Sequence, residues 1–310
     1  MADLVAAPGQ RSSGKLSCMT IALLGTGLLG SAIATRLLAC GHSLSVWNRD
    51  PERCRPLVAL GARQAASAAA AAAEADWLLT VLSDGPTTHR VLIDQVGEQL
   101  RDRRVIQIGT ISPVESQQLG DAVIALGGSY LEAPVLGSRP EALEGTLQLM
   151  TGGPTELMQA ALPLLQQLCP EPVHLGPVGS AMTAKLALNQ LIASLTHAFS
   201  LSLHLVQRGG VAVEPFMALL RSSALYAATF DKKLQRELSG DYANPNFPTA
   251  HLRKDLNLFI TAAEQAGLNS EGLSGLAALL ERSSGAGLDA LDYCALHQLT
   301  AGRTAAEEPG

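Results

Sequence analysis

The sequence predicts an α/β protein in which an N-terminal, doubly wound β-sheet is followed by an all-α C-terminal domain. Short apolar runs alternate with helical segments from residue 20 to about residue 176, which is typical of a parallel sheet covered by helices. Beyond Gly176 the pattern changes to long helical segments with few strand signals. The 310 residues are enough for two domains.

The predicted strands are short apolar runs of the kind that is buried in a parallel sheet. The first of them ends in glycine, and the second follows about twenty residues later in the chain. In chain order, strands are expected at residues 20–25, 43–47, 77–82, 104–108, 130–133 and 147–151.

Helices are predicted between these strands from apolar periodicity and from capping residues. Residues 28–40 have apolar side chains at helical spacing and end at Gly41. Another helix opens at Asp50-Pro51, because Asp caps a helix well and Pro suits its first turn. The alanine-rich residues 65–75 are expected to form a short surface helix, since alanine is the best helix former. Two longer helices are expected at residues 86–100 and 112–126.

The C-terminal domain is predicted to be helical from Met182 onward. Residues 181–206 are the most apolar stretch of this part, yet they include Lys185 and Asn189, which would be costly inside a bilayer. We therefore expect a buried helix there and no membrane partner. Turn-forming residues separate the helices at Gly209-Gly210, at Asn244-Pro245 with Pro248, and at Gly267.

The domain boundaries follow from these patterns. Residues 1–18 are poor in bulky apolar side chains and lack the apolar core of a signal peptide, so they are expected to be a disordered extension. Residues 19–182 are assigned to the sheet domain and residues 183–310 to the helical domain.

The composition argues against several classes of protein. A formal net charge of −6 makes nucleic acid an unexpected partner. The five cysteines are scattered without a CxxC pair, which indicates free thiols in a reducing compartment and a cytoplasmic location. The histidines have no metal-binding spacing, so no metal site is expected. Charged residues make up only 16% of the chain, which is compatible with surface buried in a homo-oligomer.

The segment Gly25-Thr26-Gly27-Leu28-Leu29-Gly30 matches the dinucleotide-binding fingerprint of a Rossmann domain. It follows a predicted strand and opens a predicted helix. Gly25 permits the tight turn, Gly27 lets the backbone approach a pyrophosphate at the helix N-terminus, and Gly30 allows close packing of helix on strand. A glycine-rich loop in another kind of α/β protein is the alternative.

The end of the second strand distinguishes between the two nicotinamide cofactors. NAD-binding chains usually place Asp or Glu there for the ribose hydroxyls, whereas this chain has Asn48 and Arg49. Arg49 can donate charge-assisted hydrogen bonds to a 2′-phosphate. Asp50 is one position late and is interpreted as a helix cap. NADP(H) is therefore predicted; the alternative for Arg49 is a solvated surface charge.

Lys185 and Asn189 are four residues apart and share one face of an apolar helix. A lysine in such a place either extends its ammonium group to solvent or sits in a site with a polar partner, and spacing alone leaves both open. In a carbonyl reductase the substrate oxygen needs a proton after hydride transfer. A partly desolvated lysine can give that proton, since its pKa is lowered towards neutral pH.

Several further motifs occur in order along the chain: Leu82-Ser83-Asp84 after the third strand, Gly109-Thr110 after the fourth, Glu132-Ala133-Pro134-Val135, and Lys254-Asp255. With the glycine turn and the Lys185/Asn189 pair, they make the chain resemble the β-hydroxyacid dehydrogenase family, which includes 3-hydroxyisobutyrate dehydrogenases. Within that family it is most similar to the glyoxylate/succinic semialdehyde reductase branch. The resemblance extends from about residue 20 to residue 300.

The resemblance implies a role for each of these positions. Lys185 would be the catalytic acid/base, and Asn189 would orient the substrate. The remaining roles are Leu82 and Ser83 along the cofactor, Thr110 at the nicotinamide side, Lys254 reaching the cofactor, Asp255 fixing the cofactor or Lys185, and Phe247 as an aromatic residue of the substrate pocket. The resemblance also implies a 6-phosphogluconate dehydrogenase-like helical domain, a cleft between the domains as active site, and a homodimer or homotetramer.

One departure from the family concerns the substrate. Leu136 stands where the family usually has a serine that hydrogen-bonds the substrate carboxylate. Backbone N–H groups near Gly137 or the hydroxyl of Ser138 could compensate, and a more apolar substrate becomes an alternative.

The predicted function is NADPH-dependent reduction of a small aldehyde or 2-oxo acid, of the glyoxylate or succinic semialdehyde type, with Lys185 as proton donor. Two alternatives stay open: an imine reductase-like enzyme, and a non-catalytic NADP-binding protein of the same fold. Lys185 counts against the first, because resemblance to imine reductases implies a different residue at that place.

Overall fold

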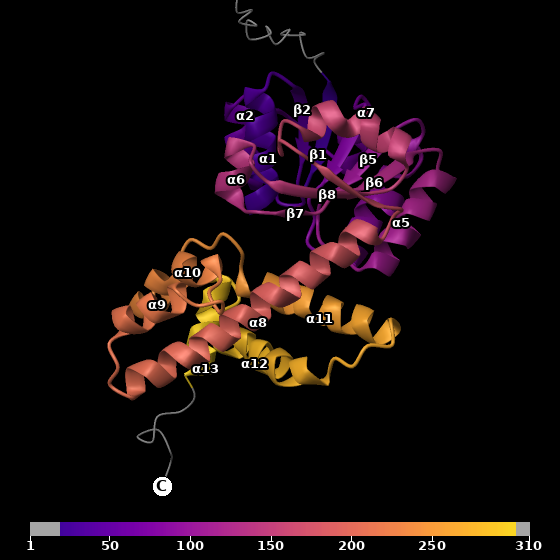
Figure 1. The fold of residues 1–310 in the computed structure, drawn as a ribbon. Coiled ribbons are helices and arrows are strands. Elements are labelled where there is room, and N and C mark those ends of the chain that lie inside the picture. The colour runs from indigo at the N-terminus through magenta and orange to yellow at the C-terminus, as the bar shows by residue number, and fades with distance from the viewer. Residues whose placement is uncertain (1–18, 302–310) are drawn as a thin grey trace, which may run out of the picture.

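A computed structural model describes residues 19–301, and it contains a sheet domain followed by a helical domain (Figure 1). The predicted extension at residues 1–18 lies outside the described residues. The long helix α8 (Ser180–Arg208) starts against the sheet and runs through the helical domain. The predicted fold class, an α/β domain followed by an all-α domain, is confirmed.

Most of the expected elements are present, and their bounds differ from the predictions by a few residues. The strands are β1 Thr20–Leu24, β2 Ser43–Trp47, β3 Arg63–Gln64, β4 Trp77–Thr80, β5 Arg104–Gln107, β6 Ser129–Glu132, β7 Val135–Leu136, β8 Gln148–Gly152 and β9 Val173–Gly176. The other α-helices are α1 Leu28–Ala39, α2 Arg55–Ala59, α3 Ala68–Ala72, α4 Gly85–His89, α5 Pro113–Ala125, α6 Arg139–Glu144, α7 Thr155–Leu165, α9 Val213–Arg221, α10 Ala228–Ser239, α11 Thr249–Gln265, α12 Ser274–Gly285 and α13 Leu296–Thr300. Short 3-10 or π segments are η1 Pro51–Cys54, η2 Arg90–Val96, η3 Gly97–Leu100, η4 Glu271–Leu273 and η5 Tyr293–Ala295.

The sheet has the strand order β3-β2-β1-β4-β5-β6-β8-β7, with β9 paired to β8. The strands from β3 to β6 are parallel, and the chain order reverses between β1 and β4. In open α/β sheets, ligands bind at such a reversal, outside the carboxyl ends of the strands. β8 runs antiparallel to β6 and to β7, so the sheet is mixed and not purely parallel.

Two apolar layers cover the faces of the sheet. Ile21 and Leu23 of β1 belong to one layer, which includes α1 and α7, while Ala22 and Leu24 belong to the other, which includes α3 and α5. This alternation is the period-two pattern of a strand that is buried on both sides. The two layers hold the carboxyl ends of β1, β4 and β5 in fixed positions at one edge of the sheet.

Three predictions about elements need correction. The alanine-rich helix exists as α3, but Ala68, Ala71 and Ala72 are buried in the core, so it is not a surface helix. Alanine has no side chain beyond Cβ, and the small side chains allow this helix to pack closely on the sheet. The predicted helix at 86–100 is helical throughout but is divided into α4, a π segment and a 3-10 segment. The edge strands β3, β7 and β9 and the helices α6 and α7 were not predicted.

The helical domain surrounds the second half of α8. Helices α9 to α13 pack against α8, with α11 and α12 along one side and α9 and α10 along the other (Figure 1). Within residues 19–301, α8 is the helix with the length and hydropathy of a membrane span, and 39% of its most apolar window is buried inside the fold. Its packing against β8, β9 and α11 favours the predicted buried helix.

Candidate active site

The glycine turn after β1 is tightly packed at two of its three glycines and open at the third. Gly25 has φ +104°, and a Cβ there would lie 2.3 Å from the carbonyl oxygen of Val81. A Cβ on Gly30 would lie 1.9 Å from the carbonyl oxygen of Gly25. Gly27 is different, because a Cβ there would meet nothing within 4 Å. Gly25 and Gly30 are therefore required by the fold, whereas Gly27 leaves open space at the N-terminus of α1.

The other residues of this turn have distinct environments. Thr26 is buried, and its Oγ1 lies 3.8 Å from Sγ of Cys54. Leu28 is exposed, and Leu29 packs on the sheet core. Ser31 donates a hydrogen bond from its hydroxyl to the carbonyl oxygen of Thr26 and thereby fixes the turn.

The tip of β2 carries Asn48 and Arg49 beside this turn. Asn48 Oδ1 accepts a hydrogen bond of 2.9 Å from the N–H of Asp50. Asp50 caps the segment that starts at Pro51, as predicted, by accepting from the N–H of Glu52. The Arg49 side chain is exposed and has no hydrogen bond or ion pair to the residues from 19 to 301. Its guanidinium is therefore available to an anionic group at the cofactor ribose.

The loops after β4 and β5 are pressed together at the same edge of the sheet. A Cβ on Gly109 would lie 2.5 Å from the carbonyl oxygen of Leu82. Ser83 donates to Oδ2 of Asp84 at 2.5 Å, and Asp84 caps α4. Thr110 presents its carbonyl oxygen to the helical domain, where Nζ of Lys254 donates to it at 2.6 Å.

Four polar side chains meet where α8 and α11 face this edge. Asp255 of α11 accepts a hydrogen bond of 2.5 Å from Nδ2 of Asn189, and Nζ of Lys254 lies 2.9 Å from its other carboxylate oxygen. Lys185 lies one turn before Asn189 on α8, is 9% exposed, and is close enough to Asp255 and Lys254 for their charges to act on it. The structure thus brings together Lys185, Asn189, Lys254 and Asp255, and Lys254 connects them to Thr110.

Burial has a strong effect on the acidity of Lys185. Burial lowers the pKa of the ammonium group. The charge of Asp255 opposes this decrease and the charge of Lys254 adds to it, so that the resulting pKa is about 8. A group with that pKa can donate and accept a proton near neutral pH. Oδ1 of Asn189 is buried without a hydrogen-bond partner among the described residues, so it remains an available acceptor beside the lysine.

The predicted substrate residues are less closely grouped. Leu136 ends β7, and the exposed Gly137 has φ +109°. Ser138 donates both its N–H and its hydroxyl to Oε2 of Glu141, each at 2.8 Å. Phe247 stacks edge-on against Tyr293, with ring centroids 5.8 Å apart, and is half-buried in the core of the helical domain. Its other ring neighbour is His251 of α11, with ring centroids 6.1 Å apart.

Glu132 belongs to one of the sequence motifs, but no role was predicted for it. It is fully buried at the end of β6, and its Oε1 accepts from the N–H groups of Ala181 (2.7 Å) and Met182 (3.3 Å) in the first turn of α8. Its other oxygen accepts from the hydroxyl of Ser116 at 2.6 Å. Burial raises the pKa of Glu132, and these hydrogen bonds oppose the rise. An acidic residue inside a buried strand was the one signal in the sequence that could have indicated this.

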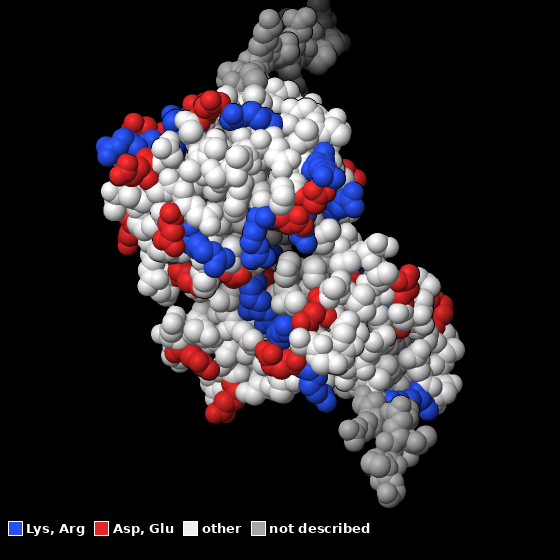
Figure 2. Space-filling model, turned by 180° about the vertical axis from the view of Figure 1, so that it is seen from behind, with Lys and Arg blue, Asp and Glu red and all other residues white. Residues whose placement is uncertain are grey.

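Basic side chains gather across the junction between the two domains on the face opposite to that of Figure 1 (Figure 2). This distribution of charge favours an anionic ligand there.

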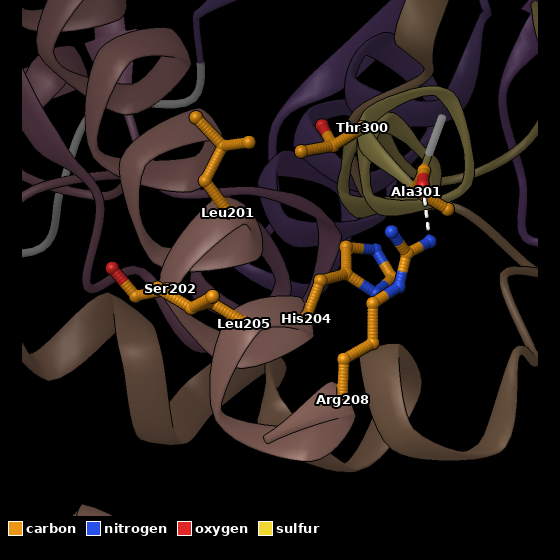
Figure 3. A pocket seen from close by; sticks show the side chains of 7 residues that line it. All are labelled: Leu201, Ser202, His204, Leu205, Arg208, Thr300 and Ala301. Atoms are coloured by element: carbon orange, nitrogen blue, oxygen red, sulfur yellow. Dashed lines mark hydrogen bonds between the residues drawn. The ribbon is translucent and has the colours of Figure 1, made fainter. Parts of the chain in front are cut away.

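A separate cavity of about 380 Å³ lies at the far end of α8, where Leu201, His204 and Arg208 face Thr300 (Figure 3). It contains none of the predicted site residues. Residues 19–301 contain no group of three or more His, Cys, Asp or Glu that could hold a metal ion.

Comparison with known proteins gives consistent matches over both domains. The NAD binding domain of 6-phosphogluconate dehydrogenase matches residues 20–176, and the NAD-binding domain of NADP-dependent 3-hydroxyisobutyrate dehydrogenase matches residues 179–300. Glyoxylate/succinic semialdehyde reductase 1 of Arabidopsis thaliana is 27% identical over 281 residues, which cover 90% of this chain and 97% of the relative.

A bacterial relative and a solved structure extend these matches. The uncharacterized oxidoreductase YfjR of Bacillus subtilis (strain 168) is 32% identical over 256 residues, covering 81% of this chain and 89% of the relative. The structure of Mycobacterium tuberculosis 3-hydroxyisobutyrate dehydrogenase with L-serine superposes with a TM-score of 0.82 at 24% identity, covering 91% of this chain and 98% of that one. At that identity the superposition shows the fold alone.

Proposed function

The chain belongs to the 3-hydroxyisobutyrate dehydrogenase family and is an NAD(P)-dependent oxidoreductase, and on this basis we propose that it reduces a carbonyl group with NADPH as hydride donor and Lys185 as proton donor. The observation that carries the proposal is the buried Lys185, which lies beside Asn189 and Asp255 at the edge of the sheet where the cofactor domain ends. Relatives with the names of reductases support a substrate with a carbonyl group.

The residues around the glycine turn fit NADP(H). The prediction of this cofactor is supported by the second family model, which describes an NADP-dependent enzyme. The open space at Gly27 and the N-terminus of α1 would receive the pyrophosphate, and Arg49 would pair with the 2′-phosphate. Ser83, Leu82 and Thr110 would lie along the nicotinamide half. When bound, NADPH supplies the hydride.

Lys185 would supply the proton. Its pKa of about 8 keeps most of the lysine protonated at neutral pH, yet the buried environment also tolerates the neutral amine that is left after proton transfer. Asp255 stabilises the charged form and holds Asn189 through Nδ2. The free Oδ1 of Asn189 would accept a hydrogen bond from the hydroxyl group of the product.

Replacement of Lys185 tests this assignment. Lys185→Met removes the proton donor but preserves the apolar stem, so turnover should fall by roughly 10²–10⁴-fold while the dissociation constant for NADPH changes less than about threefold. Lys185→Arg keeps the positive charge but cannot release a proton at neutral pH, and it should lose activity as well. Stopped-flow NADPH oxidation and fluorescence titration of NADPH measure both quantities. If either variant retains turnover, the proton donor is a different group.

The first substrates to assay are those in the relatives' names, glyoxylate and succinic semialdehyde. A cyclic imine in the same assay tests the imine reductase alternative.

A homodimer or homotetramer and a cytoplasmic location remain predictions. Three exposed leucines on α8 give the oligomer an apolar surface to bury: Leu191, Leu201 and Leu205.

A further inference from the structure

We infer that the preferred substrate presents an uncharged, apolar group, and not a carboxylate, to the loop between Leu136 and Glu141. The inference rests on the proposed carbonyl reduction at Lys185 and adds the chemical class of the substrate. Three observations carry it: the orientation of Leu136, the cavity that this side chain borders, and the hydrogen bonds that already occupy Ser138.

Leu136 faces away from the core of the sheet. Val135 is 5% exposed and packs in the sheet core, and successive side chains of a strand point to opposite sides. The side chain of Leu136 therefore points outward, where it borders a cavity of about 610 Å³ between β7, β8, β9 and α8. Leucine offers this cavity methyl groups and no hydrogen-bond donor.

The cavity adjoins the part of α8 that carries the lysine cluster. Ala184 and Leu188 line it, and each directly precedes a residue of the catalytic pair, Lys185 or Asn189. Adjacent residues of an α-helix are about 100° apart, so the cavity lies on the flank of the catalytic face. A carbonyl compound held at Lys185 can therefore extend a side group between α8 and Leu136.

The remaining walls of the cavity are mainly apolar. They include Leu147, Leu149, Met150 and Val173. The uncharged polar side chains at the cavity are Thr146 and Gln148, and the only charged side chain that lines it within residues 19–301 is Glu171. A carboxylate would lose much of its hydration among these mainly apolar side chains and would be repelled by the carboxylate of Glu171. An alkyl or aryl group would lose no hydrogen bonds on entry.

The donors that could replace the missing serine are already used. Both Ser138 donors bind Oε2 of Glu141 at 2.8 Å. Burial raises the pKa of Glu141, but the hydrogen bonds from Ser138 and the charge of Lys232 outweigh it and lower the pKa to about 2. The loop thus contains a permanent carboxylate of its own, which occupies the position where a substrate carboxylate would seek those donors.

A matched pair of substrates tests the inference. Succinic semialdehyde and its methyl ester differ in the charge of one end, and kcat/KM for NADPH oxidation should be at least about tenfold higher with the ester. In the linear series from propanal to octanal, kcat/KM should rise about fourfold per methylene until the cavity is filled. A preference for succinic semialdehyde, or no dependence on chain length, would overturn the inference and leave carbonyl reduction intact.

Substitutions in the loop between Leu136 and Glu141 give a second test of the inferred substrate class. Leu136→Ser should raise the ratio of kcat/KM for succinic semialdehyde to kcat/KM for its methyl ester by about tenfold, and it should weaken the dependence of kcat/KM on aldehyde chain length. Leu136→Ala only removes methyl groups, so it should weaken the dependence on chain length without favouring the acid. Glu141→Gln should also raise that ratio, because it removes the competing charge. Leu268→Ser is the control, since Leu268 is exposed in the turn after α11 and should leave both measures unchanged. Thermal melting of each variant checks that it folds.

Failure of the proposed function has a different signature. In that case no carbonyl compound of either series would support NADPH oxidation by the native enzyme. Calorimetric titration of 1-hexanol and of succinate into the protein saturated with NADP⁺ then tests the cavity directly. Tighter binding of succinate would overturn the inference, whereas tighter binding of hexanol would support it without any turnover.

Discussion

At the scale of single residues, Lys185 is set apart by the conflict between its burial and its charge. A lysine that is 9% exposed loses hydration, and the neighbouring Lys254 adds repulsion, while one carboxylate, Asp255, opposes both. The balance leaves the ammonium able to change its protonation state close to physiological pH, which a lysine in water does not do. The same three side chains therefore determine both the position and the acidity of the proposed proton donor.

The dependence of activity on pH should follow from this balance. Carbonyl reduction requires protonated Lys185, so its kcat should be level below the folded pKa of about 8 and fall roughly tenfold per unit above it. Alcohol oxidation requires the neutral amine, so its kcat should rise through the same pH range. Rates in both directions between pH 6 and 10 measure this. A reduction rate that stays constant from pH 7 to 10 would contradict the assignment.

Asp255→Asn provides an internal check on the same profile. Because the charge of Asp255 raises the pKa of Lys185, its removal should move the falling limb of the reduction profile to lower pH. Asp121→Asn on the exposed surface of α5 is the matched control and should leave the midpoint unchanged.

Residue-level prediction succeeded where a side chain is tied to a local signal. Asp50 as a cap and the glycine turn follow from neighbours in the sequence, and the structure agrees. The use of both Ser138 donors by Glu141 could also have been found, since the spacing is that of a capping box. The pairing of Asn189 with Asp255 joins residues 66 positions apart and was not predicted, since the family resemblance implied only that Asp255 fixes the cofactor or Lys185.

At the scale of elements, the first turn of α8 depends on a side chain from a distant strand. Gly179 precedes the helix and provides no side-chain cap, so the free N–H groups of Ala181 and Met182 are satisfied by Glu132 of β6. A carboxylate at this end also matches the partial positive charge of a helix N-terminus. Lys185 follows one turn later, so Glu132 acts as a positioning residue for the proton donor.

Two substitutions distinguish the effect of the side-chain length of Glu132 on kcat from the effect of its charge. Glu132→Asp keeps the charge but is one methylene too short, and kcat should fall roughly 10²-fold with a larger solvent isotope effect, because proton transfer from a displaced lysine becomes slow. Glu132→Gln keeps an acceptor for Ala181 and Met182 and should retain kcat within about threefold. Binding of NADPH should be unchanged in both variants. Equal losses in both variants would show that the charge, and not the position, is what matters.

Elements were predictable from the sequence where periodicity or capping is strong. The long helices and the central strands carry that signal, and their types are as predicted. The edge strands β3 and β7 are two residues long, which is too short for any periodic pattern. The burial of α3 was missed, because alanine is equally compatible with a surface and with a tightly packed core.

At the scale of the whole molecule, α8 is shared by both domains. It has 29 residues and is about 44 Å long, with Ala184 and Leu188 against the sheet domain and Ala193 in the helical core. Two further contacts cross the junction, from Lys254 to Thr110 and from Lys232 to Glu141. Relative motion of the domains must therefore bend a continuous helix.

A pair of glycine substitutions tests whether this bending limits turnover. Ala187 lies on the exposed side of α8 at the junction, and Ala198 lies on the exposed side within the helical domain. Each change to glycine should destabilise the protein by about 1 kcal/mol. If opening of the cleft controls product release, only Ala187→Gly should change the steady-state kcat while the rate of hydride transfer in a single turnover stays the same. Equal effects of the two variants would place the slow step elsewhere.

The contact between Glu132 and α8 also has a consequence for the order in which the chain folds during synthesis. The ribosome delivers the sheet strands first, and Glu132 enters the core as a buried carboxylate. Its two backbone donors belong to residues made 49 and 50 positions later, so Oε1 of Glu132 lacks these two donors in the nascent sheet domain until α8 begins to emerge. The point at which the sheet domain becomes stable on the ribosome is therefore set by the first turn of α8.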